Sequence, residues 1–468
     1  TAAYKEKLGL EIEESELENS PFYSLDKDSD EYNYLISKRN ELGGFLPSRN
    51  APKIEIDLPS NDIYSDFNEG TPEGQKVSTT MAFVRLLRKI MKSDIGDKVV
   101  PIIPDEGRTF GMDPLFSEFG IYSHQGQIYT PVDHKMLLNY KESKAGQILE
   151  EGISEANAIA SWIASATSYS HANVPTLPFY TFYSMFGFQR VADQIWSAAD
   201  ARARGFLMGA TAGRTTLNGE GLQHQDGHSL LIASTVPSCK AWDPAYAYEL
   251  STIIKHGIDE MWGQELDVFN YIMLYNENQQ QPPKPKGVDQ GIIKGAYKLI
   301  KLEEKANIKV RLLGSGPILK YVIDAHNLLK SDFGIDSEVW SVTSYGELRR
   351  EGLNIQRNNV LFPQDIRKSY VENCFGDNMP TVAVSDHISA IPEMIQRWIG
   401  GQFIVLGTDG YGRSDTREAL REFFEIDTNN IVLGTLSALE KEEQIPVGSV
   451  EKAVNTLGIN REKKDKTE

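Results

Sequence analysis

The sequence predicts an α/β protein made of two doubly wound domains in series, each built on a mostly parallel sheet. Short apolar, β-branched runs alternate with segments whose apolar residues have helical spacing. A polar stretch with prolines, NQQQPPKPKG at 278–287, divides this alternation in two and is typical of a linker. We therefore expect α/β domains over 56–284 and 285–460, an extended arm or linker over 1–55, and a charged tail over 461–468.

Both ends of the chain are polar. Residues 1–55 are acidic and interrupted by prolines, which predicts an extended arm or interdomain linker rather than a packed core. The chain begins without Met, at TAAYKEKLGL, so we expect a processed or partial piece of a longer protein. The closing REKKDKTE carries enough charge to fray.

The first domain opens with a helix followed by a buried strand. Apolar residues between Ala82 and Met91 have helical spacing, and the run KVVPIIPDE after them is short and β-branched, as in a parallel strand. Further strands are expected at 176–183, 204–210, 229–235 and 268–276, with helices near 154–168, 188–200 and 245–262.

The second domain repeats the alternation. Strand patterns such as KVRLLGSG and FIVLGTDG are each followed by a segment with helical spacing, which indicates another parallel sheet. The expected strands are 309–316, 338–344, 381–386 and 403–410, and the expected helices are 317–330, 388–399 and 415–424.

Composition excludes several classes of partner. The net charge of −18, with no basic stripe, argues against nucleic acid. The two cysteines, Cys239 and Cys374, form no CxxC pair, so neither a disulfide framework nor a zinc knuckle is expected and a reducing cytoplasm fits best. No apolar run approaches the roughly 18 residues that span a bilayer, so no membrane association is expected.

A glycine-rich segment, GFLMGATAGRTTLNGEGLQHQDGH at 205–228, is the first candidate site because glycines lie among many titratable side chains. Its spacing does not fit a phosphate loop, which needs four residues between the glycines and a Lys before Ser or Thr. Glu220, His224 and His228 have the spacing of metal ligands on a helix, but the glycines make a helix improbable, so no metal site is predicted. His224 remains a candidate proton donor or substrate anchor. The alternative is that both histidines only satisfy buried backbone groups.

A carboxylate at the start of a predicted helix is the second candidate. Ser154 is a good N-cap for a helix that begins at Glu155, and Glu155 shares a face with Ile159, Trp162 and Ile163. A carboxylate on an apolar face needs a partner, which a ligand nitrogen could provide. The alternative is a capping carboxylate favoured by the helix dipole.

Two further groups lie near predicted strand ends. Asp105 and Glu106 end the strand in IIPDEGRTFG, at the edge where α/β sheets place ligands, although pairing with Arg108 competes with a functional role. Most aromatic side chains in LPFYTFYSMFGFQR must belong to the core. One or two of them could form a wall for a flat aromatic ligand.

Six motifs resemble those of the thiamine-diphosphate-dependent pyruvate dehydrogenase component of the homodimeric bacterial type, over about Tyr34 to Ile459. They are PIIPDEGRTFGMDPLF, GQILEEGISEANA, PFYTFYSMFGFQR, ARGFLMGATAGRTTLNGEGLQHQDGHS, DPAYAYE and VLGTDGYGRSD. The resemblance implies a thiamine-diphosphate-binding pyrimidine-type domain followed by the C-terminal domain of the transketolase superfamily. It also implies oxidative decarboxylation of pyruvate, with acetyl transfer to a lipoyl domain of the acetyltransferase component.

The same resemblance implies a role for each candidate residue. Glu155 would hydrogen-bond the aminopyrimidine ring nitrogen of the cofactor, and His224 would contact the substrate-derived carboxylate or enamine. Glu106, with Asp105 beside it, would lie next to the cofactor ring. The residues that would line the pyrimidine pocket are Tyr183, Phe186 and Ile153. The stretch from about 125 to 141 would be a mobile loop that excludes water from the site.

One departure from the family pattern concerns magnesium and the diphosphate. In the family these are held by a separate amino-terminal domain with a GDG motif and an Asn about thirty residues later. Neither GTDG at 407–410 nor GDN at 376–378 has that context, and the loop histidines for acetyl transfer to lipoamide are also missing. We therefore expect a two-part enzyme, inactive without a GDG-containing half that is another chain or a missing domain.

Two alternative functions and two forms of assembly stay open. The chain could belong to a thiamine-dependent enzyme that forms acyloins or transfers acyl groups, or it could be a non-catalytic scaffold subunit. The expected assembly is an oligomer across the active site, either a dimer or a heterotetramer with the GDG-containing half.

Overall fold

The computed structural model describes residues 2–46, 56–104, 107–131, 140–304 and 306–467. The chain divides into two compact units, Thr1–Lys53 and Ile54–Glu468. No helix among the described residues has both the length and the apolar character needed to cross a membrane.

The first unit is partly helical, which corrects the expectation of an extended conformation. It contains helix α1 (Ala2–Leu8), the 3-10 helix η1 (Glu14–Asn19) and helix α2 (Asp30–Glu41), none of which buries a residue. Helix α2 forms because Ser29 caps it: its hydroxyl accepts a hydrogen bond from the Tyr32 amide at 3.1 Å. The Ser29 cap therefore supports helix α2 although the helix buries no residue.

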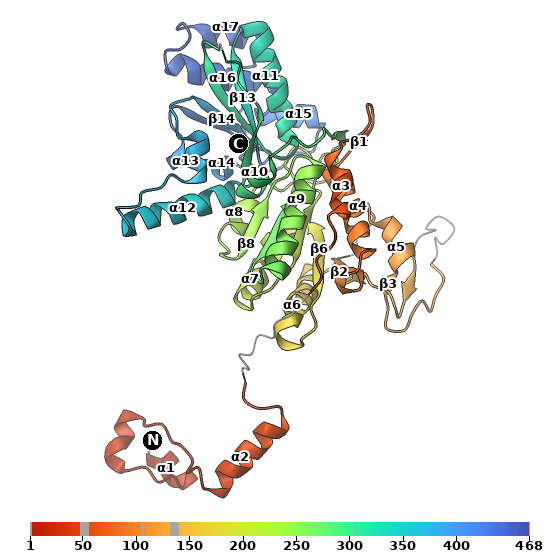
Figure 1. Cartoon of the computed structure of the whole chain (residues 1–468), viewed down its shortest axis with the longest axis vertical. Helices are drawn as coiled ribbons and strands as arrows, with labels where there is room; N and C mark the ends of the chain where they lie inside the picture. Colours follow the sequence, from red (N-terminus) through yellow and green to blue (C-terminus); the bar gives the residue numbers. More distant parts are fainter. Residues whose placement is uncertain (1, 47–55, 105–106, 132–139, 305, 468) are drawn as a thin grey trace. The chain divides into compact units, whose positions relative to one another are not determined.

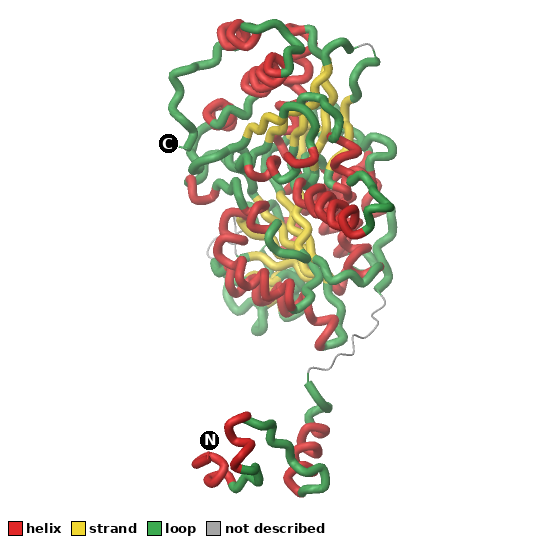
Figure 2. The backbone as a smooth tube through the Cα atoms, turned by 90° about the vertical axis from the view of Figure 1, so that its left-hand side faces the viewer, coloured by secondary structure: helices red, strands yellow, loops and turns green. Residues whose placement is uncertain are grey.

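The described part of the second unit contains two large sheets (Figures 1 and 2). The first has six parallel strands in the order β5-β2-β6-β7-β9-β8. Their bounds are β5 Leu149–Glu150, β2 Val99–Ile103, β6 Leu177–Tyr183, β7 Phe206–Ala210, β9 Phe269–Met273 and β8 Cys239–Trp242. The main helices of this domain are α4 Thr79–Met91, α6 Glu155–His171, α7 Ser184–Asp200 and α9 Ala247–Ile258. The predicted doubly wound parallel sheet is confirmed.

One predicted strand of the first domain is wrong. Residues 229–235 contain helix α8 (Ser229–Ala233), and the strand of this region is β8, which follows it. The Asp226 carboxylate accepts hydrogen bonds from the amides of His228 (2.9 Å) and Ser229 (3.0 Å), so it satisfies donors at a helix start. A short apolar run such as SLLIAS fits a strand or a helix, and these hydrogen bonds to Asp226 favour the helix.

The second sheet has the order β11-β13-β12-β14-β15, with only β11 antiparallel. Its strands are β11 Ala296–Ile300, β13 Asp336–Val342, β12 Lys309–Gly314, β14 Thr381–Val384 and β15 Phe403–Leu406. Its longer helices are α11 Leu319–Phe333, α12 Tyr345–Leu361 and α16 Thr428–Lys441. The sequence did not predict β11, α12 or α16. The expected helix at 388–399 is two short pieces, Ala390–Glu393 and Gln396–Trp398, in keeping with Pro392, which cannot donate a backbone hydrogen bond.

Short elements complete the unit. The pair β1 (Lys76–Val77) and β10 (Gln279–Gln280) is antiparallel, and β3 (Ile121–Tyr122) pairs with β4 (Glu142–Ser143). The short helices are α3 Asp62–Ser65, α5 Asp113–Phe119, α10 Asp289–Lys294, α13 Tyr370–Phe375, α15 Arg417–Phe423 and α17 Ser449–Thr456. Because β10 lies within the predicted linker 278–287, that stretch is tied to the first domain.

The charged tail lies against the second domain and does not fray as expected. The Lys466 ammonium donates to the Gly407 carbonyl at 2.8 Å and lies 3.9 Å from the Asp409 carboxylate. Lys463 also donates to the Glu422 carbonyl. Two lysines of the tail therefore donate to backbone carbonyls, Lys466 to one just after β15 and Lys463 to one on α15.

Candidate active site

Four of the predicted site residues lie at the carboxyl edge of the first sheet. Glu155 begins α6, Tyr183 ends β6, and Phe186 lies in the first turn of α7. His224 belongs to the segment that follows β7, at the end of the 3-10 turn Leu222–His224. Strands β5, β2, β6 and β7 are consecutive in the sheet, so the segments after them meet at the edge where α/β proteins bind ligands.

His224 packs against two aromatic rings. Its ring centroid lies 5.2 Å from that of Tyr183 and 5.0 Å from that of Phe186, and the two aromatic rings are 5.7 Å apart. Among the described residues the buried Nδ1 atom of His224 has no hydrogen-bond partner. A buried nitrogen without a partner is costly, so this atom needs a polar partner beyond the described residues.

Glu155 is paired with a cation that the sequence analysis missed. Nη1 of Arg190 lies 2.9 and 3.0 Å from the two carboxylate oxygens, and the guanidinium lies 4.1 Å from the Phe186 ring centroid. The Glu155 side chain is 12% exposed, against 52% for Arg190. The signal was present in FGFQR, since Phe186 and Arg190 are four residues apart on one helix face.

The alternative of a carboxylate favoured by the helix dipole agrees with the position of Glu155 in the first turn of α6. Ser154 is the N-cap, and its hydroxyl accepts from the Asn157 amide at 3.4 Å, while Glu155 turns to Arg190. The predicted apolar face is present, because Ile159 and Trp162 are fully buried. The carboxylate thus lies at the border between the core and the edge of the sheet.

The aromatic run divides as the sequence predicted. Phe179, Tyr180, Phe182 and Phe188 are fully buried, whereas Tyr183 and Phe186 are partly exposed. The Tyr183 ring also lies 5.3 Å from the ring of Phe110, in an edge-on arrangement. Most of the run is therefore core, and its last two rings form a wall beside His224.

Of the other predicted residues, Ile153 is described and does not join this group. The side chain of Ile153 is 77% exposed just ahead of the N-cap, and Asp105 and Glu106 lie outside the described residues. Arg108, expected to compete for these acids, lies 3.2 Å from Asp113. The expected loop at 125–141 includes residues 132–139, which the structure does not describe.

Glu220, His224 and His228 do not form a metal site in the described part of the chain. His224 Nε2 lies 3.7 Å from Glu220, but His228 contacts Gln189 and lies 3.3 Å from Arg214. Burial lowers the pKa of His228, and the Arg214 charge lowers it further although Asp226 opposes this. The segment is a loop with one 3-10 turn, so the i, i+4, i+8 spacing does not place the three side chains together.

Comparison with known families agrees with the two-domain fold. Residues 56–282 match the model of the pyruvate dehydrogenase E1 component middle domain. Residues 295–427 match the transketolase-like C-terminal domain.

The chain belongs to the pyruvate dehydrogenase E1 family. It is 49% identical over 467 residues to the pyruvate dehydrogenase E1 component of Pseudomonas aeruginosa, covering 99% of this chain and 53% of the relative. It is 44% identical to that of Escherichia coli, covering 98% of this chain and 52% of the relative. The chain therefore spans about half the length of the curated relatives it matches.

Solved structures share the fold. A transketolase from Leishmania mexicana superposes with a TM-score of 0.61 at 15% identity, covering 82% of this chain and 48% of the other. A split-gene transketolase described as an inactive beta4 tetramer gives a TM-score of 0.51 at 16% identity, covering 78% of this chain and 98% of the other. At such identities the likeness concerns the fold alone.

Proposed function

We propose that this chain provides the pyrimidine-binding and C-terminal domains of a thiamine-diphosphate-dependent pyruvate dehydrogenase. The enzyme would decarboxylate pyruvate oxidatively and transfer the acetyl group to a lipoyl domain of an acetyltransferase component. The observation that carries the proposal is the convergence of Glu155, the Tyr183–Phe186 wall and His224 at the carboxyl edge of the first sheet.

The residues at this edge fit the pyrimidine end of thiamine diphosphate. Partly exposed rings of Tyr183 and Phe186 offer flat apolar contacts to a planar heterocycle. Glu155 offers a carboxylate to a ring nitrogen, and Ile153 and Glu106 are proposed as further contacts. The buried Nδ1 of His224, which has no partner among the described residues, suits a polar ligand. When bound, the cofactor would supply the electron sink that decarboxylation requires.

The chain's own residues would align and shield the reacting groups. Arg190 holds both oxygens of Glu155, so it fixes the direction in which the carboxylate meets the ring nitrogen. His224 would donate a hydrogen bond to the carboxylate of pyruvate. The rings of Phe110, Tyr183 and Phe186 would keep water from one side of the site.

The diphosphate and its magnesium ion would be bound by residues outside this sequence. The described residues contain no group of acidic, His or Cys side chains able to hold a metal. We infer that a GDG-containing half supplies this site, either as a partner chain or as another part of a longer polypeptide. We further propose assembly as an oligomer across the active site.

The test is Glu155→Gln in the holoenzyme assembled with the GDG-containing half. Because the amide cannot replace the carboxylate at the ring nitrogen, pyruvate decarboxylation should fall by about 100-fold. Glu118→Gln is the matched control, since Glu118 is also paired with an arginine, Arg88, but lies on α5, which carries none of the candidate site residues.

Three outcomes would count against the proposal. Undiminished decarboxylation in Glu155→Gln would refute the role of this carboxylate. Assembly without binding of thiamine diphosphate would favour a scaffold subunit. Product analysis with and without a lipoyl domain would reveal an acyloin-forming or acyl-transferring enzyme instead.

A further inference from the structure

The segment that carries His224, residues 213–228 and hereafter the His224 segment, is held on both sides of the histidine by the second domain. The ring contacts of His224 among the described residues are with Tyr183 and Phe186 of the first domain. Hydrogen bonds from the second domain hold the backbone of the His224 segment. The distance between His224 and the aromatic wall therefore depends on how the two domains are joined.

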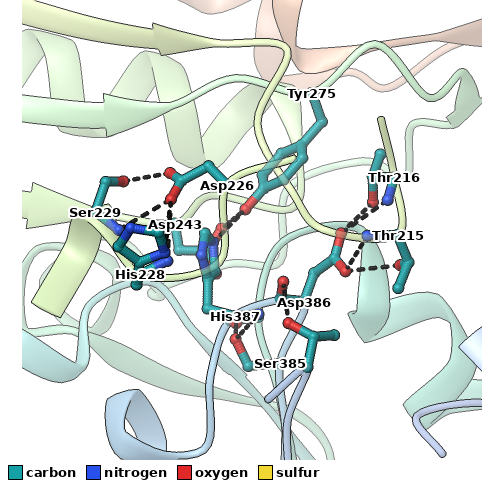
Figure 3. Close-up of polar contacts among 12 residues, drawn as sticks. Thr215, Thr216, Asp226, His228, Ser229, Asp243, Tyr275, Ser385, Asp386 and His387 are labelled. Atoms are coloured by element: carbon teal, nitrogen blue, oxygen red, sulfur yellow. Dashed lines mark hydrogen bonds and ion pairs between the residues drawn. The ribbon is translucent and has the colours of Figure 1, made fainter. Parts of the chain in front are cut away.

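The principal anchor is Asp386, which follows β14 (Figure 3). One carboxylate oxygen accepts hydrogen bonds from the Thr215 amide (2.9 Å) and hydroxyl (2.6 Å). The other accepts from the Thr216 amide (3.0 Å) and hydroxyl (2.6 Å). The Asp386 side chain is buried, so these four bonds form away from water and fix two successive residues of the segment.

A buried arginine supports the same two threonines. Arg421 donates to the Thr215 hydroxyl at 3.3 Å and to the Thr216 hydroxyl at 3.2 Å, and it is ion-paired with Glu277. Each hydroxyl thus donates to Asp386 and accepts from Arg421. This arrangement fixes the orientation of both hydroxyl groups.

Further contacts from the second domain continue past His224. Arg417 donates to the Thr216 carbonyl at 2.7 Å, and the Ser414 hydroxyl donates to the Glu220 carbonyl at 2.6 Å. Beyond the histidine, the Ile388 amide donates to the Gly227 carbonyl at 2.8 Å. The anchors are therefore distributed along the whole His224 segment.

We propose that Asp386 is a positioning residue that sets the place of His224 against the Tyr183–Phe186 wall by acting through Thr215 and Thr216. The inference rests on the proposed function in one respect, that His224 meets the substrate. It assigns to the second domain, which provides none of the residues at the candidate active site, the task of aligning the substrate-binding side chain. A displacement of about 1 Å can cost a catalytic group about 100-fold in rate, so such alignment matters.

Asp386→Asn is the test because the amide has nearly the same shape. The amide oxygen of the new Asn side chain can still accept hydrogen bonds from one threonine. Its NH2 group would face the amide and the hydroxyl of the other threonine, which are both donors, so the side chain must move. The matched control is Glu338→Gln. Glu338 is a buried carboxylate of the same domain, and its bonds to Arg311 (2.6 Å) and Trp340 (2.8 Å) remain within the second domain.

The first measurement uses the full chain with carbon-13 at the Cε1 atoms of its 8 histidines. The His224 signal, identified by its loss in His224→Asn, should shift in Asp386→Asn because its distance to two aromatic rings changes. The signal of His326, which bonds the Ser337 hydroxyl at 2.8 Å, should not move. Glu338→Gln should leave the His224 signal in place. An unchanged His224 signal in folded Asp386→Asn would overturn the proposal.

The second measurement uses the assembled holoenzyme. Asp386→Asn should raise KM for pyruvate about tenfold or more relative to Glu338→Gln, with a smaller change in kcat. Equal KM values in the two variants would contradict the proposal. If Asp386→Asn fails to fold, Thr216→Val is the second variant. It removes one hydroxyl but keeps the hydrogen bond from the backbone amide of residue 216 to Asp386. It should give a smaller shift of the His224 signal and a smaller rise in KM. A wild-type holoenzyme without pyruvate decarboxylation would refute the proposed function, while the histidine spectra would still test the positioning of His224.

Discussion

The two parallel sheets use their carboxyl edges differently. The edge of the first sheet, hereafter the open edge, carries the partly exposed side chains of Glu155, Tyr183, Phe186 and His224. The corresponding residues after the strands of the second sheet are buried. They are Ser315, Thr343, Ser344, Ser385, Asp386, His387 and Thr408.

The first domain itself covers the second edge. The Asp243 amide donates to the Thr343 carbonyl at 2.8 Å, and the Ser344 hydroxyl donates to the Ala241 carbonyl at 2.6 Å. We call this buried contact zone the domain seam. Equivalent positions of one architecture thus stay partly exposed in one domain and hold a neighbouring domain in the other, so the fold alone does not predict a binding site.

The largest expected difference concerns the arginine of each region. Arg421→Met at the seam should lower the free energy of unfolding by about 3 kcal/mol, because Glu277 and two threonines lose a buried partner. Arg190→Met at the open edge should cost less than about 1 kcal/mol, since that arginine is half exposed. Urea unfolding of the full chain measures both. Equal losses would show that the seam is no more tightly coupled than the open edge.

A second comparison uses one glycine with positive φ from each region. Gly213 (φ +95°) at the seam has no room for a methyl group, which would meet the Asp386 carboxylate and come within 3.0 Å of Thr216 Cβ. Gly152 (φ +75°) near the open edge has no atom within 4 Å of that position. Gly213→Ala should therefore destabilise the chain by about 2–3 kcal/mol and Gly152→Ala by about 1 kcal/mol. Similar urea unfolding midpoints for Gly213→Ala and Gly152→Ala would contradict tight packing at the seam.

The smallest expected effect is a pH dependence at the seam. Burial raises the pKa of Tyr275 well above its usual value, and the charge of Asp243, to which its hydroxyl donates, adds to this. The unfolded chain then loses this proton more readily, so the stabilisation is complete below about pH 10 and declines above it. Between pH 9 and 11 the wild type should lose about 1 kcal/mol more than Tyr275→Phe. Parallel pH profiles of unfolding would refute this role of the buried hydroxyl.

The sequence predicted the open edge well because its signals are local. A cap at Ser154, an aromatic run ending at Tyr183 and Phe186, and the glycine-rich stretch around His224 each lie within a short window. The parallel strands then bring these windows together. Arg190 was missed although it lies near Phe186, because its carboxylate partner is 35 residues away.

The seam could not be predicted in the same way. Asp386 lies 171 residues from Thr215, and Arg421 lies 206 residues from it. Such pairs exist only after both sheets have formed and docked, so no periodicity or spacing marks them. The incorrect prediction of a strand at 229–235 has a related cause. Its apolar run fits either a strand or a helix until the hydrogen bonds from the His228 and Ser229 amides to Asp226 are considered.

The docked tail has a practical consequence for chemical labelling. Lys466 keeps only 22% of its side chain exposed while it donates to the Gly407 carbonyl, whereas Lys7 on α1 is exposed. An amine-reactive dye should therefore attach to Lys7 well before Lys466. A fluorophore on Lys7 would report on the first unit without disturbing the end of β15, and one forced onto Lys466 would remove the donor that holds the tail there.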